Sequence, residues 1–280
     1  MIVYRTKKDL TQHLDALRNA DKSIGLVPTM GALHQGHTSL VVKAASENDA
    51  VVVSIFVNPT QFNDPADLEK YPSTLDQDLE LLQSMNVDLV FIPSVNEMYP
   101  QEDIRSFDLE NLDKVMEGKH RKNHFLGVVQ IVSKLFLVVN PHKAYFGQKD
   151  FQQLVIVRHL VQLMNMELDI VACPIVREED GLAMSSRNVR LSREERNLAP
   201  FIYITLKLAR EKKGSLSPVE IRSWVITQFM EQPLMQLEYF EIVENKGLHQ
   251  IMSWEEKGNK VGCIAVLIGE VRLIDNLIFD

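Results

Sequence analysis

The chain has 280 residues, a length that favours two domains over a single compact core. Hydrophobic residues make up 45% of it and charged residues 24%, which is typical of ordinary globular proteins. The formal net charge of −8 argues against non-specific binding to nucleic acid or to an anionic membrane surface.

Two cysteines, Cys173 and Cys263, lie far apart in the sequence and favour a reducing compartment over a disulfide scaffold. No apolar signal core follows the first residues. No uninterrupted apolar run approaches the roughly 18 residues that a membrane helix needs. We therefore expect a cytoplasmic protein with neither a membrane nor nucleic acid as its partner.

Helices and apolar strands alternate along the first part of the chain. Leucines at helical spacing follow Thr6, and residues 50–57 are apolar nearly throughout, which is typical of a parallel strand buried on both faces. The other elements expected here are strands over 23–29, 88–93, 143–146 and 167–173, and helices over 37–45, 75–85, 108–117, 127–139 and 151–164.

This alternation predicts an α/β fold with a Rossmann-like, doubly wound parallel sheet. We place that domain at residues 1–175 and a smaller C-terminal α/β domain at residues 176–280. In the smaller domain, a capping-box pattern at Ser192 predicts a helix to about residue 212, and Pro218 begins another. Its strands are expected near 237–243, 262–268 and 271–273.

One strand-to-helix junction carries the first sign of chemistry. The strand over 23–29 passes through glycines into a helix, whose first N–H groups lack internal partners and carry roughly half a positive charge. His34 and His37 stand at this turn, and Gly36 lets a flat group approach the backbone. The pattern indicates a nucleotide phosphate held by the helix and imidazole groups.

Two other interpretations of this histidine pair stay open on these residues alone. The imidazoles could serve only as polar caps of the helix. They could also bind a metal ion, but zinc normally takes three or four protein ligands and the motif offers two.

Further candidate side chains follow other strands. Gln61 lies in a loop after residues 50–57, and its amide can bind both a hydroxyl and a carboxylate. Lys149 precedes a second helix as a possible phosphate ligand, and Gln153 can face the same crevice. Ser185, Ser186 and Arg187 can bind polyphosphate. Gln61 and the serine-rich segment could instead be ordinary solvated loop residues.

A basic segment over residues 118–125 is a further candidate site for an anion, with a solvated loop as the alternative.

Together these segments resemble the pantothenate synthetases (pantoate–β-alanine ligases), a family within the His-x-Gly-His nucleotidyltransferases. The matching segments are residues 28–37, 56–62, 147–153 and 184–188, with weaker matches at 71–72, 98–100 and 272–276. Each motif alone is weak or moderate, but their joint order and spacing are highly specific. The resemblance spans most of the chain.

The resemblance implies an ATP-dependent ligase that works in two steps. The carboxylate of (R)-pantoate attacks the α-phosphate of ATP, giving pantoyl adenylate and pyrophosphate. The amine of β-alanine then attacks the adenylate and releases AMP and pantothenate. Mg²⁺ is expected to accompany ATP, held mostly by phosphates and water, with no protein ligands. The resemblance also implies a homodimer, and a smaller domain that closes over the nucleotide.

The resemblance assigns catalytic roles to His37, His34, Lys149 and Arg187, with His37 as the donor to the departing pyrophosphate. Gln61 is expected to contact pantoate and β-alanine, and Gln153 to contact pantoate. The nucleotide-binding residues that it implies are Met30, Gly31, Ala32, Leu33, His34, Gln35, Gly36, His37, Gly147, Gln148, Lys149, Asp150, Val176, Met184, Ser185, Ser186 and Arg187.

This chain departs from the family pattern at two places. Gln148 stands where the family usually has glutamate. Asn123 replaces the glycine of an Arg-Pro-Gly-His-Phe segment. Because asparagine tolerates the left-handed conformation, we expect that turn to be kept. The role of Arg121 in the altered segment stays open.

Two rival functions fit part of the pattern. A nucleotidyltransferase acting on a phosphate ester would need no β-alanine. A non-catalytic nucleotide sensor would bind ATP but release no pyrophosphate with pantoate.

Overall fold

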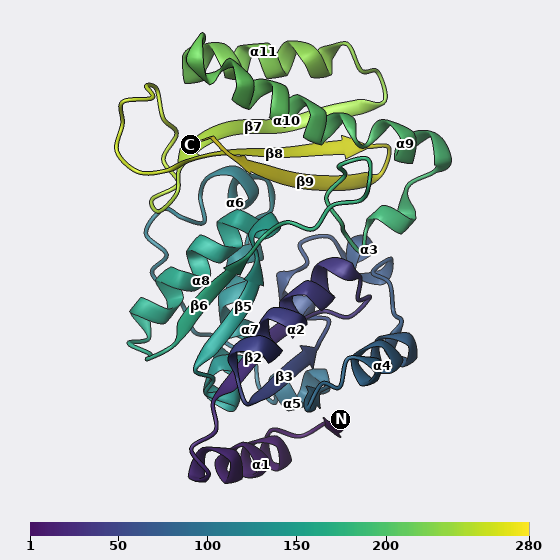
Figure 1. Cartoon of the computed structure of the whole chain (residues 1–280), viewed down its shortest axis with the longest axis vertical. Coiled ribbons are helices and arrows are strands. Elements are labelled where there is room, and N and C mark those ends of the chain that lie inside the picture. Colours follow the sequence, from purple (N-terminus) through teal and green to yellow (C-terminus); the bar gives the residue numbers. More distant parts are fainter. Residues whose placement is uncertain (280) are drawn as a thin grey trace. The chain divides into compact units, whose positions relative to one another are not determined.

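The computed structural model describes residues 1–279 of the chain (Figure 1). The chain divides into two compact units, Met1–Gly147 with Ile156–Cys173 and Gln148–Val155 with Pro174–Asp280. The domain boundary at residue 175 and the closing role of the smaller domain stay predictions.

The first unit is built on a six-stranded parallel sheet in the order β1-β4-β3-β2-β5-β6. Its strands are β1 (Ile2–Tyr4), β2 (Ile24–Thr29), β3 (Ala50–Ile55), β4 (Leu89–Phe91), β5 (Lys143–Gly147) and β6 (Asp169–Cys173). The chain order reverses between β2 and β5, which makes the sheet doubly wound and confirms the predicted fold class. In such sheets, ligands bind beyond the carboxyl ends of the strands at this reversal.

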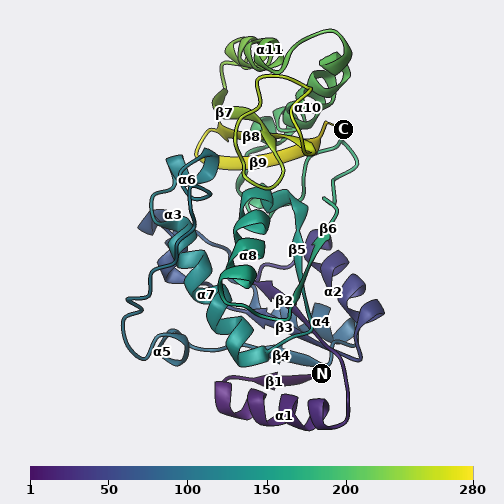
Figure 2. The same cartoon turned by 90° about the vertical axis from the view of Figure 1, so that its left-hand side faces the viewer.

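Helices lie on both faces of this sheet, with α2 and α7 on opposite sides (Figure 2). The helices of this unit are α1 (Lys7–Asn19), α2 (Gln35–Glu47), α3 (Pro65–Glu69), α4 (Leu75–Ser84), α5 (Val95–Met98), α6 (Met116–His120) and α7 (His124–Val139). A further helix, α8 (Phe151–Leu163), begins in the second unit and ends in the first.

The central strands β2, β3 and β4 confirm the burial that their composition predicts. Every residue of β3 is buried, as expected for a parallel strand covered on both faces. β2 and β3 pair along their whole length, from Ile24 opposite Ala50 to Thr29 opposite Ile55. This pairing fixes where β2 ends, and therefore where the following turn begins.

The second unit contains a three-stranded antiparallel sheet in the order β7-β8-β9. Its strands are β7 (Met235–Glu244), β8 (Lys260–Ile268) and β9 (Val271–Ile278), and its helices besides the start of α8 are α9 (Arg193–Leu198), α10 (Phe201–Glu211) and α11 (Pro218–Met230). Apolar side chains of α10, α11 and the sheet form one buried core. None of the helices described in residues 1–279 is long and apolar enough to cross a membrane.

Two predicted helices are wrong in their extent. Residues 108–115 are not helical, because Glu110 and Met116 adopt positive φ values of 55° and 42°. The Asp108 carboxylate accepts the N–H of Glu110 in a local turn (2.9 Å), and the helix forms only from Met116.

The helix predicted from Ser192 to about residue 212 is two helices. Its start is confirmed, since Ser192 and Glu195 form the expected capping box. The chain then breaks between Leu198 and Phe201 around Pro200, which has no N–H to continue the helical hydrogen bonds. The last strand, predicted to end at residue 273, continues to Ile278.

Glu47, at the end of α2, ties this helix to β5. It pairs with Lys43 (2.5 Å) and Lys143 (3.2 Å) and accepts a hydrogen bond from the hydroxyl of Tyr145 (2.9 Å). The Lys43, Tyr145 and Lys143 groups lower the pKa of Glu47 to about 2.

Because the folded-state pKa of Glu47 is depressed, its contribution to stability is complete above pH about 4.5 and is lost as the pH falls toward about 2. We expect Glu47→Gln to lower the urea midpoint at pH 7, with the gap to the parent protein narrowing steadily below pH 4.5. The exposed Glu80 gives a control variant, Glu80→Gln, which should leave the midpoint nearly unchanged. A gap that stays constant down to pH about 2 contradicts the pairing of Glu47.

Candidate functional site

The turn between β2 and α2 depends on two residues with left-handed backbone. Gly31 has φ of 80° and Ala32 has φ of 49°. A Cβ on Gly31 would lie 3.0 Å from Oδ2 of Asp78 and 3.2 Å from Cγ2 of Ile55, so a side chain here would strain the backbone and press on both neighbours. The chain can therefore leave the sheet abruptly and enter α2.

Asp78 on α4 holds this turn. Its side chain is buried, and its Oδ2 accepts the N–H of Ala32 (2.9 Å) while its Oδ1 accepts the N–H of Leu33 (2.8 Å). The hydroxyl of Thr74 donates a third hydrogen bond to Oδ1 (3.2 Å). Sequence reasoning missed Asp78. The sequence does contain a signal for it, because Asp78 falls on the apolar face of α4 at helical spacing. A carboxylate buried there needs a partner elsewhere in the fold.

The two histidines do cap α2. Nδ1 of His34 accepts the N–H of Gly36 (3.1 Å), and Nδ1 of His37 accepts the N–H of His34 (3.3 Å). Their ring centroids lie 4.1 Å apart. Because Nδ1 accepts in both rings, the hydrogen-bond geometry assigns the proton of each neutral ring to Nε2. Capping of α2 thus engages Nδ1 of each ring and does not itself involve Nε2.

Gln61 sits on the short helical turn η1 (Pro59–Gln61) that follows β3. Its Nε2 donates to the Sδ of Met30 at 2.8 Å, and its Oε1 accepts from Nδ2 of Asn58 at 3.3 Å. The amide is thus oriented with its oxygen toward Asn58 and its nitrogen toward the β2–α2 turn. Met30 and Gln61, both predicted site residues, are in direct contact.

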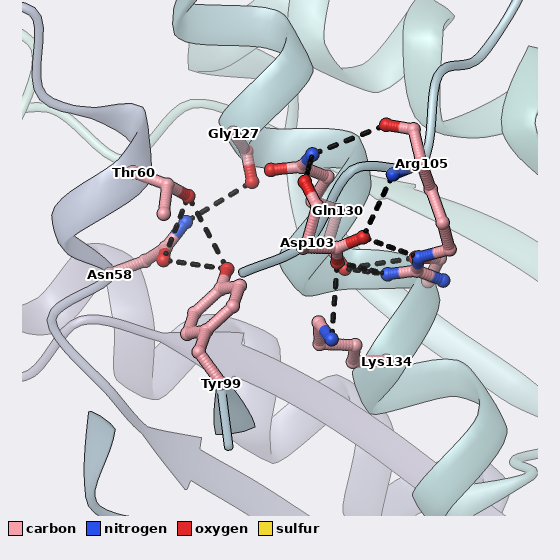
Figure 3. Close-up of polar contacts among 9 residues, drawn as sticks. Asn58, Thr60, Tyr99, Asp103, Arg105, Gly127, Gln130 and Lys134 are labelled. Carbon is pink, nitrogen blue, oxygen red and sulfur yellow. Dashed lines mark hydrogen bonds and ion pairs between the residues drawn. The ribbon is translucent and has the colours of Figure 1, made fainter. Parts of the chain in front are cut away.

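Asn58 is fixed from several sides (Figure 3). Its Nδ2 also donates to the carbonyl of Gly127 (3.1 Å), and its Oδ1 accepts from the hydroxyls of Tyr99 (2.8 Å) and Thr60 (3.1 Å). A Cβ on Gly127 would lie 2.3 Å from the carbonyl oxygen of Thr60, so glycine lets α7 pack directly on η1. Asn58 was not among the predicted site residues.

The altered basic segment leads to the same turn. Asn123 adopts a left-handed conformation (φ 63°), as predicted for a residue replacing glycine, and α7 begins at His124 rather than at residue 127. A guanidinium only donates, so Nε2 of His124 accepts from Arg121 (3.0 Å) and Nδ1 donates to the carbonyl of Gln61 (2.8 Å). Arg121 therefore orients His124, which holds the backbone of Gln61.

A second polar cluster joins the segment after α5 to α7 (Figure 3). Asp103 accepts from Nε (2.8 Å) and Nη2 (2.6 Å) of Arg105 and pairs with Lys134 (3.1 Å). The Arg105 guanidinium holds the pKa of Asp103 well below its usual range. The buried amide of Gln130 donates to the carbonyls of Asp103 (2.8 Å) and Arg105 (3.2 Å). This cluster anchors a loop, and none of its members was a predicted site residue.

The second unit carries the other predicted residues. Gln148, Lys149 and Asp150 form the short helical turn η2 (Gln148–Asp150) directly before α8, whose first turns carry the half-buried Gln153. In the loop after β6, the N–H of Met184 donates to the carbonyl of Val176 (3.0 Å), so these two residues are neighbours.

Ser185 and Arg187 lie in this same loop, where the hydroxyl of Ser185 accepts the N–H of Arg187 (3.2 Å).

The described residues 1–279 contain no group of three or more His, Cys, Asp or Glu side chains that could hold a metal ion. In the first unit, the observed arrangement is a doubly wound sheet whose central strand ends in a histidine-capped helix with an oriented amide beside the turn. This arrangement defines an α/β protein of the nucleotide-binding type.

Comparison with known proteins gives the family. The family model described as pantoate-beta-alanine ligase matches residues 2–278. A curated pantothenate synthetase from Phocaeicola vulgatus is 56% identical over 278 residues. The match covers 99% of this chain and 99% of that protein. The chain belongs to the pantoate-beta-alanine ligase family.

Solved structures agree with this assignment. The crystal structure of pantothenate synthetase from Thermus thermophilus is 41% identical, with a TM-score of 0.91 and 99% coverage of both chains. A pantoate-beta-alanine ligase from Francisella tularensis, solved in complex with beta-gamma ATP and β-alanine, is 36% identical. Its TM-score is 0.81, with coverage of 100% of this chain and 98% of that chain.

Asp78→Ala removes the acceptor of two backbone N–H groups and one hydroxyl. We expect a loss of about 3 kcal/mol in the free energy of unfolding, because partly buried donors left unpaired cost about 1–3 kcal/mol each. Urea denaturation measures this loss. Asp76→Ala on the same turn of α4 is the matched control, because Asp76 is exposed. Equal losses in the two variants contradict the role assigned to Asp78.

Proposed function

We propose that this chain joins (R)-pantoate to β-alanine in an ATP-dependent reaction that gives pantothenate, AMP and pyrophosphate. The match to the ligase family over nearly the whole chain carries this proposal. The geometry of the histidine pair supports it, because two Nε2–H groups at a helix start suit a phosphate ligand.

The first step is a phosphoryl transfer. A carboxylate oxygen of pantoate forms a bond to the α-phosphorus of ATP, the bond from that phosphorus to the bridging oxygen breaks, and pyrophosphate leaves. In the second step, the amine of β-alanine attacks the acyl carbon, AMP leaves and the nitrogen loses a proton. Both steps depend mainly on positioning and on stabilisation of developing charge.

In the first unit, we assign the phosphate contacts to the turn from Met30 to His37. His37 donates from Nε2 to the departing pyrophosphate, and His34 assists at the phosphates. Both donors are fixed before ATP binds, because the opposite ring nitrogens are engaged in capping α2. Preorganised donors of this kind need no rearrangement as charge builds up in the transition state.

We assign Gln61 to pantoate and β-alanine. The hydrogen bond from Asn58 to Oε1 of Gln61 directs the amide nitrogen toward the β2–α2 turn. One N–H of this nitrogen contacts Met30, and the other can donate to an incoming carboxylate. Gln153 is proposed as a second amide for pantoate.

The second unit contributes the remaining nucleotide-binding residues of the proposal. Lys149 neutralises phosphate charge and Arg187 adds a planar group of donors. The other members proposed from the family resemblance are Gly147 at the end of the first unit and, in the second, Gln148, Asp150, Val176, Met184, Ser185 and Ser186. Mg²⁺, which would screen the phosphate charges, is assigned to ATP oxygens and water.

A homodimer, a cytoplasmic location and closure of the smaller domain over the nucleotide complete the proposal. Closure would exclude water from the acyl adenylate, which hydrolysis would otherwise consume.

The test is incubation of the purified protein with ATP, Mg²⁺, pantoate and β-alanine, omitting each component in turn, with the products identified by mass. We expect pantothenate and AMP only in the complete mixture. Pyrophosphate release from ATP and a phosphate ester, with no requirement for pantoate or β-alanine, would point to the rival nucleotidyltransferase. ATP binding without pyrophosphate release would point to a nucleotide sensor.

His37→Ala is expected to slow pyrophosphate release about 10²–10³-fold, the usual loss on removing one preorganised donor. Two further variants separate donation from capping. The amide nitrogen of glutamine can reach the position of Nε2, whereas asparagine can replace only Nδ1. We therefore expect His37→Gln to retain more activity than His37→Asn, measured by pyrophosphate release at saturating substrates. The reverse order would assign His37 to capping alone.

A further inference from the structure

Asn276, in the weakly matching segment near the C-terminus, reaches the backbone beside Lys149. It lies on β9 with only 1% of its surface exposed. Its Nδ2 is 2.9 Å from the carbonyl oxygen of Gln148 and 2.9 Å from that of Lys149. One side-chain amide thus uses both hydrogens on two consecutive carbonyls of η2.

Asn276 is itself held by a buried ion pair. Arg177 binds Asp275 with two hydrogen bonds, from Nη1 to Oδ2 (2.6 Å) and from Nη2 to Oδ1 (2.9 Å), and its guanidinium lies 3.7 Å from the ring centroid of Tyr203. The carboxylate of Asp275 accepts the N–H of Asn276 (2.7 Å). The Nη2 of Arg177 also reaches the carbonyl of Asn276 (3.3 Å).

Arg177 also contacts the loop that leads to the other nucleotide-binding segment proposed for this unit. Arg177 donates to the carbonyl of Gly181 (3.1 Å), and it pairs with Ala183 in an isolated β-bridge just before Met184. Arg177, Asp275 and Asn276 therefore form one buried cluster that contacts both η2 and the loop leading to Arg187.

Within the described part of the chain, the side-chain amide of Asn276 makes hydrogen bonds at its nitrogen only. Its Oδ1 is buried and has no hydrogen-bond partner within residues 1–279. A buried polar atom without a partner destabilises a fold, so its presence calls for a reason. We attribute it to the nitrogen of the same amide, because this one atom supplies both donors for the carbonyls of η2.

We propose that Asn276 is a positioning residue for Lys149. Its two hydrogen bonds fix the turn before α8 so that the Lys149 side chain and the N–H groups of this turn are held ready for a phosphate group. Arg177 and Asp275 keep Asn276 in place. The inference rests on the proposed role of Lys149 in ATP binding.

The first test measures the dissociation constant for ATP with Mg²⁺ by calorimetry. Asn276→Asp replaces the donors with a carboxylate that repels both carbonyls, and Asn276→Ser is a smaller change in case the first variant folds poorly. We expect ATP to bind about tenfold more weakly to either variant, as for coupled neighbouring residues. An affinity equal to that of the parent protein would overturn the inference.

Gln130→Ala is the matched control. Gln130 is also a buried amide that donates to two backbone carbonyls, those of Asp103 and Arg105, but it belongs to the loop anchor of the first unit. We expect it to lower the unfolding midpoint about as much as Asn276→Ser and to leave ATP affinity unchanged. An equal loss of ATP affinity in Gln130→Ala would assign the effect of Asn276 to general destabilisation.

A double-mutant cycle tests whether Asn276 acts through Lys149. In a Lys149→Ala background, Asn276→Ser should change ATP affinity by less than about twofold, because the group that it positions is gone. A full tenfold effect in that background would separate Asn276 from Lys149 and contradict the inference.

Hydrogen exchange distinguishes this inference from the proposed function. Amides of residues 148–152 should exchange faster in Asn276→Ser than in the parent protein, whether or not the protein is active. Unchanged exchange overturns the positioning role. If the parent protein itself binds no ATP, the proposed function fails, and the exchange measurement still decides whether Asn276 holds the turn.

Discussion

The buried carboxylate of Asp78 decides the geometry of the β2–α2 turn, and the rest of the first unit's site depends on it. A carboxylate out of water needs donors, and the N–H groups of Ala32 and Leu33 supply them. These contacts hold the chain in the left-handed conformation that brings His34 to the start of α2. Without this anion, the turn would lose the contacts that fix its position after β2.

Much of the fold could be predicted because its signals are local. Uninterrupted apolar runs predict buried parallel strands, and the left-handed turn at Asn123 follows from the tolerance of asparagine for positive φ. The failures have local causes as well. Glu110 and Met116 adopt positive φ that their residue types do not favour, and Pro200 divides a helix whose polar and apolar pattern continues past it.

The candidate site was predictable only in its motifs. Glycines and histidines around a strand-to-helix junction mark a phosphate site by their types, whereas supporting residues are ordinary in sequence. Asp78, Asn58 and Asn276 act through partners that lie up to 128 positions away in the sequence, and a single sequence does not show which distant residues meet in space. The sequence shows a weak match around Asn276, but the contact of this residue with η2 depends on the fold of β9.

The capping role of the histidine pair limits how these two rings can carry positive charge. Capping keeps Nδ1 of His34 and His37 as acceptors, so protonation of either ring at that nitrogen would cost a backbone hydrogen bond of α2. The start of α2 therefore keeps both imidazoles as acceptors at Nδ1, and its helix dipole adds partial positive charge. The chain has a net charge of −8, so a phosphate-binding cation has to come from a particular basic side chain. Because the lysine side chain is flexible, a fixed backbone helps to define the position of its ammonium group.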